Sequence, residues 1–346
     1  MAAAYAVQVK NLSKIIGGAV ILDDLSLSIL AGSIAGIIGR SGAGKTTLLR
    51  CLNGLESPTS GDIYLFKKNV VGLDEQNRRF FQRKIGTVFQ NFHLLSRRTV
   101  FDNIAFPLEI RGVRSSVIKK RVKEVLHLVG LGHKVHAYPK ELSGGQCQRV
   151  AIARAIAADV NLLLCDEFTS ALDPETTLDI LSLLSELNRK LKLTVVLITH
   201  DMNVIREICD AVFVLEMGQC VESGSIADIL LNPTHPTTQS LIGSLFCHEL
   251  PQIYAEKLST VPLETSHVIL RMLFANQVAK EPIIASLVEQ FHLPVNIIAG
   301  HLDHIRETAF GQLMISFPYV PSVLVNVKEY LRMRQVAVEL VGYLHA

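Results

Sequence analysis

The stretch GRSGAGKTT, from Gly39 to Thr47, has the residue types and spacing of a phosphate-binding loop. Its glycines allow successive backbone N–H groups to turn toward a phosphate without interference from Cβ atoms, and a helix that begins near Gly44 directs its positive end at the same anion. Lys45 reaches the β- and γ-phosphates, and the Thr46 hydroxyl is a ligand for Mg²⁺. We expect ATP to be held by Gly39, Arg40, Ser41, Gly42, Ala43, Gly44, Lys45, Thr46 and Thr47.

Four further polar residues follow apolar stretches and are candidates for the chemistry. Asp166 ends the stretch NLLLCD, where a carboxylate is costly unless it faces a cation, so we expect it to coordinate Mg²⁺ through the second shell. Glu167, the next residue, is placed to polarise an attacking water. Gln90 is suited to contact Mg²⁺ or that water, and His200 to donate a hydrogen bond to the γ-phosphate. Each of these residues taken singly would more often be a surface or structural residue; their combination favours catalysis.

A second glycine pair occurs in LSGGQ, about a hundred residues after the first loop. Ser143, Gly144 and Gly145, followed by Gln146, open the expected helix QCQRVAIARAIA and create another helix N-terminus suited to a phosphate. The first loop already holds its own nucleotide. The second glycine pair therefore predicts that two copies of the chain pack head to tail, each covering the other's ATP.

The order of apolar runs indicates an α/β fold. The runs SIAGIIG, NLLLCD, LTVVLITH and DAVFVLEMG are continuous and alternate with helical patterns, which is typical of a mostly parallel sheet covered on both faces. In KTTLLRCLNGL, Leu48, Leu49, Leu52 and Leu55 are expected to share one helical face. We expect an ATP-binding domain over residues 1–232, with a helical subdomain at about 91–145.

The pattern changes after Leu231. Prolines and threonines in NPTHPTTQ and further prolines at Pro251 and Pro262 predict a linker over 233–266, with one short helix at TQSLIGSLF. Beyond it, residues 267–346 read strand, helix, strand, strand, helix, strand, with a hairpin across RET. That order predicts a ferredoxin-like α+β domain of the βαββαβ type.

Composition excludes several classes of protein. The 34 basic and 32 acidic side chains leave a formal net charge of +2, far from the basic excess of a nucleic-acid binder, and we expect no nucleic-acid partner. The six cysteines are scattered without metal spacing, which favours buried reduced thiols. Neither a signal peptide nor an apolar run long enough to span a membrane is recognisable in the sequence.

The motifs closely resemble those of the ATP-binding subunits of ABC transporters. The phosphate loop, Gln90, LSGGQ, DE, SALD and His200 occur in that family's order, and the resemblance covers Val7 to about Leu231. It implies that Ser170 to Asp173 face the partner chain, with Asp173 at the shared nucleotide. It also implies that TVFDNIAFPLEIRG helps to line a groove for a cytoplasmic helix of the permease.

Within that family, the whole chain resembles the ATPase subunits of bacterial methionine importers, through FQNFHLLSRRTVFDNIAFPLEI, TSALDPETT and the C-terminal VNIIAG. Such subunits carry a ferredoxin-like domain, named for an Asn-Ile-Leu triplet, that binds methionine as an effector and pairs with its twin. Here the triplet reads Asn296, Ile297, Ile298, and Asn296 is the candidate ligand contact; the alternative is a polar residue at a strand edge. The resemblance further implies permease partners, an extracytoplasmic binding protein and a peripheral position at the cytoplasmic face of the inner membrane.

Other hypotheses remain at this point. In one alternative, the chain is the ATPase of an importer whose cargo is another amino acid or a lipid. In another, it is an ABC ATPase that acts on ribosomes or DNA, although such proteins usually have two cassettes or a long coiled coil. A sensor with an inert cassette is disfavoured by the intact Lys45, Asp166 and Glu167. Three residues depart from the family pattern: Ile16 replaces an aromatic that stacks on adenine, Phe168 replaces Ala or Pro, and Cys147 replaces Lys.

Overall fold

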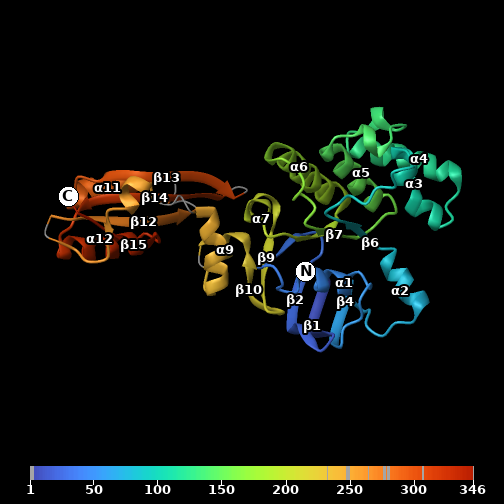
Figure 1. Cartoon of the computed structure of the whole chain (residues 1–346), viewed down its shortest axis with the longest axis horizontal. Helices are drawn as coiled ribbons and strands as arrows, with labels where there is room; N and C mark the ends of the chain where they lie inside the picture. The colour runs from blue at the N-terminus through green and yellow to red at the C-terminus, as the bar shows by residue number, and fades with distance from the viewer. Residues whose placement is uncertain are drawn as a thin grey trace. The chain divides into compact units, whose positions relative to one another are not determined.

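Six strands form the sheet that positions the candidate nucleotide site, in the order β10-β9-β3-β8-β7-β6 (Figure 1). Neighbours pair in parallel except for the β9–β10 hairpin. Every residue of β3 and β8 is buried, as continuous apolar runs predict for strands covered on both faces. The predicted mostly parallel sheet is therefore confirmed. The strands are β3 (Ile34–Ile38), β6 (Ile85–Val88), β7 (Leu162–Asp166), β8 (Thr194–Ile198), β9 (Ala211–Glu216) and β10 (Gln219–Ser225).

The computed structural model describes residues 4–231, 233–246, 250–263, 265–275, 278, 281–305 and 308–345. The chain divides into two units, which are described separately. The first contains Met1–Ile229 and Thr234–Thr238, and the second contains Leu230–Pro233 and Gln239–Ala346.

Helices follow the strands of the six-stranded sheet. They are α1 (Lys45–Leu52), α2 (Glu75–Gln82), α6 (Pro174–Leu191), α7 (Met202–Ile208) and α8 (Ile226–Leu231). In α1, Leu48, Leu49 and Leu52 are buried as predicted, but Leu55 is 62% exposed. The expectation for Leu55 is wrong because the helix ends at Leu52 and the chain then turns through Gly54, whose φ is 70°.

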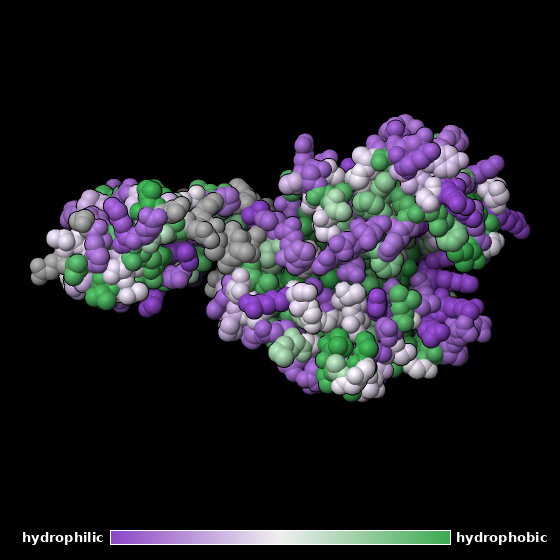
Figure 2. Space-filling view, in the orientation of Figure 1, coloured by the Kyte–Doolittle hydropathy of each residue, from purple (hydrophilic) through white to green (hydrophobic). Residues whose placement is uncertain are grey.

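An antiparallel sheet that the sequence patterns did not identify lies beside the parallel one. It contains β1 (Tyr5–Ile16), β2 (Ala19–Leu30), β4 (Ser60–Leu65) and β5 (Lys68–Asn69), in the order β2-β1-β4-β5. Its inner side chains join one hydrophobic cluster with those of β3 and α1. Figure 2 shows hydrophobic residues on the surface over this sheet. Its exposed large apolar residues are Tyr5, Ile15, Ile16, Val20 and Leu30.

The predicted helical subdomain contains α3 (Val100–Ile110), α4 (Ser115–Leu128), the short 3₁₀ turns η1 (Gly132–Lys134) and η2 (Pro139–Glu141), and α5 (Gly144–Ile156). Figure 1 shows α3, α4 and α5 on the opposite side of the six-stranded sheet from β1, β2 and β4. Helix α3 packs against α5, so the helix that follows LSGGQ is part of this subdomain.

The second unit has the predicted ferredoxin-like order, β12 (His267–Ala275), α11 (Ile283–Phe291), β13 (Asn296–Ile305), β14 (Thr308–Pro318), α12 (Pro321–Met333) and β15 (Ala337–Leu344). Its sheet runs β11-β15-β12-β14-β13. The segment predicted as a linker contains more structure than expected: helices α9 (Pro236–Phe246) and α10 (Gln252–Ala255) precede β11 (Leu258–Ser259), which adds a fifth strand by pairing with β15. Arg306 and Glu307 of the predicted hairpin turn lie outside the described residues.

The core of the second unit predicts how that unit unfolds. Leu331 on α12 is fully buried in a cluster that shares no residue with the cluster of the parallel sheet. Leu331→Ala should destabilise the second unit by about 2–5 kcal/mol, because it removes buried methyl groups and leaves a cavity. Val325→Ala on the same helix is the control, since Val325 is 63% exposed. Calorimetry should show a lower melting temperature for one transition only; an equal shift of both transitions would contradict separate cores.

Candidate functional site

The turn between β3 and α1 is built from glycines that cannot be replaced without moving backbone. Gly39, Gly42 and Gly44 have φ values of 154°, 81° and 96°, in the region that disfavours side chains. A Cβ on Gly39 would lie 2.2 Å from the Leu215 carbonyl oxygen, and one on Gly44 would lie 2.8 Å from the Ile21 carbonyl oxygen. Strands β9 and β2 therefore hold this turn in contact with their backbones.

Lys45 lies inside that turn and is only 7% exposed. Its Nζ donates hydrogen bonds to the carbonyl oxygens of Gly39, at 2.8 Å, and Arg40, at 2.9 Å. Burial lowers the pKa of Lys45, while the nearby carboxylates of Glu167 and Asp166 act in the opposite direction. The ammonium is thus a largely buried cation in the loop whose backbone N–H groups can also bind an anion, which suits it to bind phosphate oxygens.

A cleft of about 680 Å³ opens over the turn. The residues of the first loop from Ser41 to Thr47 line it, together with Ile21, Glu167 and His200. The structure therefore brings the phosphate loop and two of the predicted catalytic side chains into one cavity. Ile21 was missed by the sequence patterns, because its strand β2 was not identified.

Asp166 and Glu167 end β7 beside β8. Asp166 is half-buried, and burial followed by the charge of Glu167 raises its pKa, against the opposing effects of Arg50 and Lys45. Glu167 adopts a left-handed φ of 43° and its N–H donates to the Ile198 carbonyl at 2.8 Å. Glu167 Oε1 lies 3.2 Å from His200 Nδ1, so the two candidate catalytic groups meet directly.

These residues fit a magnesium ion. The Thr46 side chain is exposed on the cleft, and hydroxyl and carboxylate oxygens are the ligands that Mg²⁺ prefers. Burial, and then the Glu167 carboxylate, raise the pKa of Asp166, and a divalent cation beside it would favour the ionised form. Among the described residues, no cluster of three or more His, Cys, Asp or Glu side chains is suited to hold a metal by itself. Thr46 and Asp166 would hold a magnesium ion together with the phosphate oxygens of a nucleotide.

Gln90 is exposed two residues after β6 and is not among the residues that line the cleft. Because β6 and β7 pair in parallel, Gln90 and Asp166 follow neighbouring strands at the same edge of the sheet. The structure thus places Gln90 near the carboxyl edge of the sheet without bringing its side chain into the cleft.

The second glycine pair lies outside that cleft, at the start of α5. Ser143 Oγ accepts from the Gln146 N–H at 3.3 Å and Gln146 Oε1 accepts from the Ser143 N–H at 3.1 Å, a capping box that fixes the helix N-terminus. A Cβ on Gly145 would lie 2.5 Å from Cγ2 of Thr176, and Asp173 caps α6 by accepting from the Thr176 N–H at 2.9 Å. The helix that begins at LSGGQ and the helix that begins at Asp173 thus start side by side. The phosphate loop lies apart from them, in the cleft described above.

The candidate effector residues lie on β13, the last strand of the second sheet. Asn296 is exposed opposite Ser316, Ile297 is 53% exposed, and Ile298 lies at an irregularity in the pairing with β14. Met314 is fully buried on β14 opposite Ala299.

Ile16 ends β1, opposite Ala19, and is 46% exposed. It does not line the cleft; the apolar residue that does is Ile21. Within the described part of the chain, no helix has the length and apolar character needed to cross a membrane.

Comparison with known proteins gives two family matches. Residues 22–170 match the ABC transporter family, and residues 268–340 match the NIL domain. The methionine import ATP-binding protein MetN of Rhodospirillum rubrum is 45% identical over 327 residues, which are 94% of this chain and 93% of the relative. The protein of the same name from Desulfitobacterium hafniense is 44% identical over 339 residues, 97% of this chain and 99% of the relative.

Solved structures resemble the first part of the chain. A dimeric ATP-binding cassette in a post-hydrolysis state, bound to ADP and inorganic phosphate, is 35% identical with a TM-score of 0.58, and the match covers 64% of this chain and 98% of that one. CbiO1 from Clostridium perfringens, part of an ABC transporter complex, is 28% identical with a TM-score of 0.63, and the match covers 72% of this chain and 97% of that one.

Proposed function

The chain belongs to the methionine import ATP-binding proteins of the ABC transporter family. From this premise we propose which of its residues bind ATP, which hydrolyse it and which bind methionine as an effector. It is the ATP-hydrolysing subunit of an importer. The observation that carries the assignment of the site is the single cleft in which the phosphate loop, Glu167 and His200 meet.

ATP binds with its β- and γ-phosphates in the turn from Gly39 to Thr47. Backbone N–H groups and the N-terminus of α1 hold the phosphate oxygens, and the Lys45 ammonium moves from the carbonyls of Gly39 and Arg40 to the nucleotide. Mg²⁺, when bound, neutralises charge that develops on the transferred phosphoryl group. Thr46 holds that ion directly, Asp166 holds it through the second shell, and Gln90 joins it when its segment moves toward the cleft.

Glu167 acts as the general base toward the attacking water. Its carboxylate is in the cleft, and its left-handed backbone, fixed by the hydrogen bond to Ile198, directs it away from the strand. His200, in contact with Glu167 Oε1, orients that carboxylate and donates a hydrogen bond to the γ-phosphate. Glu167 therefore acts on the attacking water and His200 on the γ-phosphate that the water attacks.

Two copies of the chain complete the active sites. Ser143, Gly144, Gly145 and Gln146 form a helix N-terminus outside the cleft of their own chain, and the relative solved with ADP and phosphate is dimeric. In a head-to-tail pair, α5 and Asp173 of one chain cover the ATP in the cleft of the other. Hydrolysis removes the ligand that joins the two copies.

The remaining partners follow from the family. The pair docks on membrane-spanning permease subunits at the cytoplasmic face of the inner membrane, and an extracytoplasmic binding protein delivers methionine to the permease. Helix α3 and its neighbours contact a cytoplasmic helix of the permease. In the second unit, Asn296, with Ile297 and Ile298, binds methionine as an inhibitory effector.

Removal of the general base tests the hydrolytic site. Glu167→Gln should retain ATP binding but slow hydrolysis by about 10²–10⁴-fold, and should favour a stable ATP-bound pair because the ligand is no longer cleaved. Turnover and size-exclusion chromatography with ATP measure the two effects. Glu186→Gln, which removes only an exposed ion pair with Lys190, is the control; near-normal turnover of Glu167→Gln would refute the assignment.

Mixing two inactive variants tests the sharing of sites. A Lys45→Ala chain and a Ser143→Arg chain should each be inactive alone. A mixed pair retains one intact site, formed by Lys45 of the second chain and Ser143 of the first, so the mixture should regain ATPase activity, up to about half of the wild-type value per pair if the sites act independently. Normal hydrolysis by Ser143→Arg chains alone would exclude the head-to-tail arrangement.

Methionine titration tests the second unit. Methionine should inhibit ATP hydrolysis by the complete transporter, Asn296→Ala should weaken that inhibition, and a chain that ends at Ser266 should hydrolyse ATP without it. Coupling of this kind is typically worth about 1–3 kcal/mol, a shift of about 5–150-fold in apparent affinity. Asn326→Ala, on an exposed site of α12, is the control. Unchanged inhibition in both the Asn296 variant and the shortened chain would refute the effector site.

A further inference from the structure

The segment between Gln90 and α3 has an unfavourable backbone conformation. Phe92 and His93 are successive non-glycine residues with left-handed φ values of 55° and 47°. Such residues persist only where their surroundings hold them, and they are found at switch regions. The contacts that hold this segment therefore determine where Gln90 can lie.

The first of these contacts comes from α5. Arg154, in the last turn of that helix, donates from Nη1 to the His93 carbonyl at 2.6 Å and from Nη2 to the Phe92 carbonyl at 2.8 Å. The guanidinium is mostly withdrawn from water, and burial lowers its pKa. A planar fork with two parallel donors matches the two adjacent carbonyls in a way that a lysine ammonium cannot.

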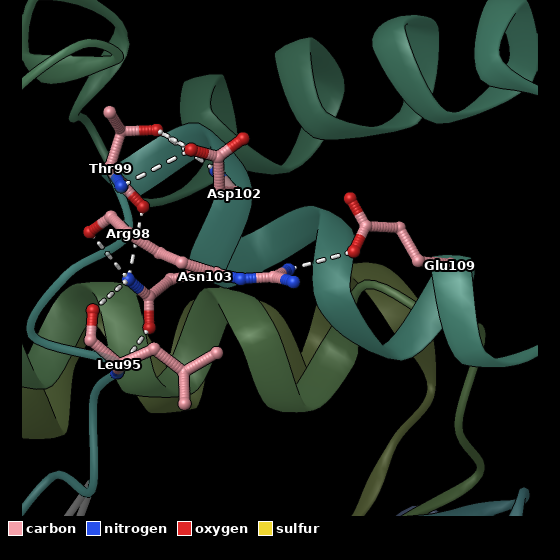
Figure 3. A network of polar contacts seen from close by, with 6 residues as sticks. All are labelled: Leu95, Arg98, Thr99, Asp102, Asn103 and Glu109. Atoms are coloured by element: carbon pink, nitrogen blue, oxygen red, sulfur yellow. Dashed lines mark hydrogen bonds and ion pairs between the residues drawn. The ribbon is translucent and has the colours of Figure 1, made fainter.

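The second contact comes from α3 (Figure 3). The fully buried Asn103 amide donates to the carbonyls of Leu95, Arg98 and Thr99 at 3.2, 3.1 and 3.0 Å, and its Oδ1 accepts from the Leu95 N–H at 2.8 Å. The segment from Leu95 to Thr99 is thereby fixed to the start of α3. The two strained residues, Phe92 and His93, lie between this fixed part and Gln90, and Arg154 holds them.

Helix α5 connects the Arg154 contact with Phe92 and His93 to the second glycine pair. It runs from Gly144 to Ile156 without interruption, so Arg154 lies ten residues after Gly144, about 15 Å along the helix axis. A displacement of the Phe92–His93 backbone must therefore move or rotate α5 as a body or break the two Arg154 hydrogen bonds.

We propose that Arg154 is a positioning residue that ties the backbone following Gln90 to the helix that begins at Ser143. The inference rests on the proposed head-to-tail pair. When Gln90 of one chain moves toward the cleft, Arg154 transmits the movement to the α5 that the same chain supplies to its partner's site. Occupation of one site thus prepares the other, and ATP hydrolysis depends cooperatively on ATP concentration.

Arg121 provides a matched comparison, because it serves the same helix without contacting this segment. It donates to the carbonyls of Ala157, at 2.9 Å, and Ile156, at 3.2 Å, and pairs with Asp159. Loss of the Arg121 fork removes hydrogen bonds to the end of α5 but leaves those from Arg154 to Phe92 and His93 in place. Only Arg154 connects α5 to the segment after Gln90.

The experiment compares Arg154→Lys with Arg121→Lys in the complete transporter, with ATPase rate measured against ATP concentration. The wild type and Arg121→Lys should give sigmoidal curves. Arg154→Lys should give a Hill coefficient near 1 and a several-fold higher half-saturating ATP concentration, with a smaller change in the rate at saturation. A hyperbolic wild-type curve, retained cooperativity in Arg154→Lys, or equal loss in both variants would overturn the proposal; an inactive wild type would instead overturn the ATPase assignment.

A second variant keeps the proposal testable if Arg154→Lys does not fold. His93 is exposed, and glycine adopts its left-handed φ without strain, so His93→Gly should leave the melting temperature unchanged or raise it. It should nevertheless lower the Hill coefficient, because a more flexible backbone at this position transmits less of the movement of Gln90 to Arg154. Lys192→Gly, at another exposed left-handed position with φ of 51°, should preserve cooperativity. Wild-type cooperativity in His93→Gly would contradict the proposal.

Discussion

The turn between β3 and α1 leaves no room for a Cβ at Gly39 or Gly44, and the candidate nucleotide site is arranged around that constraint. Gly39 approaches the Leu215 carbonyl on β9, and Gly44 approaches the Ile21 carbonyl on β2. Both sheets of the first unit are therefore in contact with the loop that binds phosphate. Lys45 reaches back to the Gly39 and Arg40 carbonyls of the same turn, so its ammonium lies at the loop. Rigid support of this kind is what preorganised charge stabilisation requires.

A single chain contains two phosphate-binding helix starts that cannot serve one nucleotide. The cleft at α1 includes Glu167 and His200, whereas the start of α5 packs against Thr176 and the Asp173 cap. The close contact at Gly145 fixes α5 relative to α6, so α5 cannot tilt toward its own cleft without displacing the start of α6. The proposed division of the site between two chains, with ATP as the shared ligand, follows from how α5 is packed.

Much of this architecture could be predicted from the sequence, for identifiable reasons. Strands buried on both faces, such as β3 and β8, are continuous apolar runs. The second unit has the ferredoxin-like βαββαβ order of strands and helices. The antiparallel sheet was missed because β2 alternates buried and exposed positions and includes Asp23 and Asp24, so no run stands out. Ile21 was missed with it. The two-residue strand β11 carries no pattern of its own and exists only by pairing with β15. The position of Gln90 outside the cleft could not be predicted either, because the segment after it is held by tertiary contacts such as those of Arg154 with the Phe92 and His93 carbonyls.

The electrostatics of the cleft show why nucleotide binding and stability of the first unit are linked. Burial lowers the pKa of Lys45 and raises that of Asp166, so both charged forms are disfavoured by partial loss of water. Each shift has the sign that weakens the folded state at neutral pH, because the unfolded chain holds Lys45 protonated and Asp166 ionised at no such cost. Phosphate oxygens beside Lys45 and a divalent cation beside Asp166 supply the missing counter-charges. We therefore expect ATP with Mg²⁺ to bind the folded chain in preference to the unfolded one and to stabilise it, because Lys45 and Asp166 gain counter-charges when the proposed site is occupied.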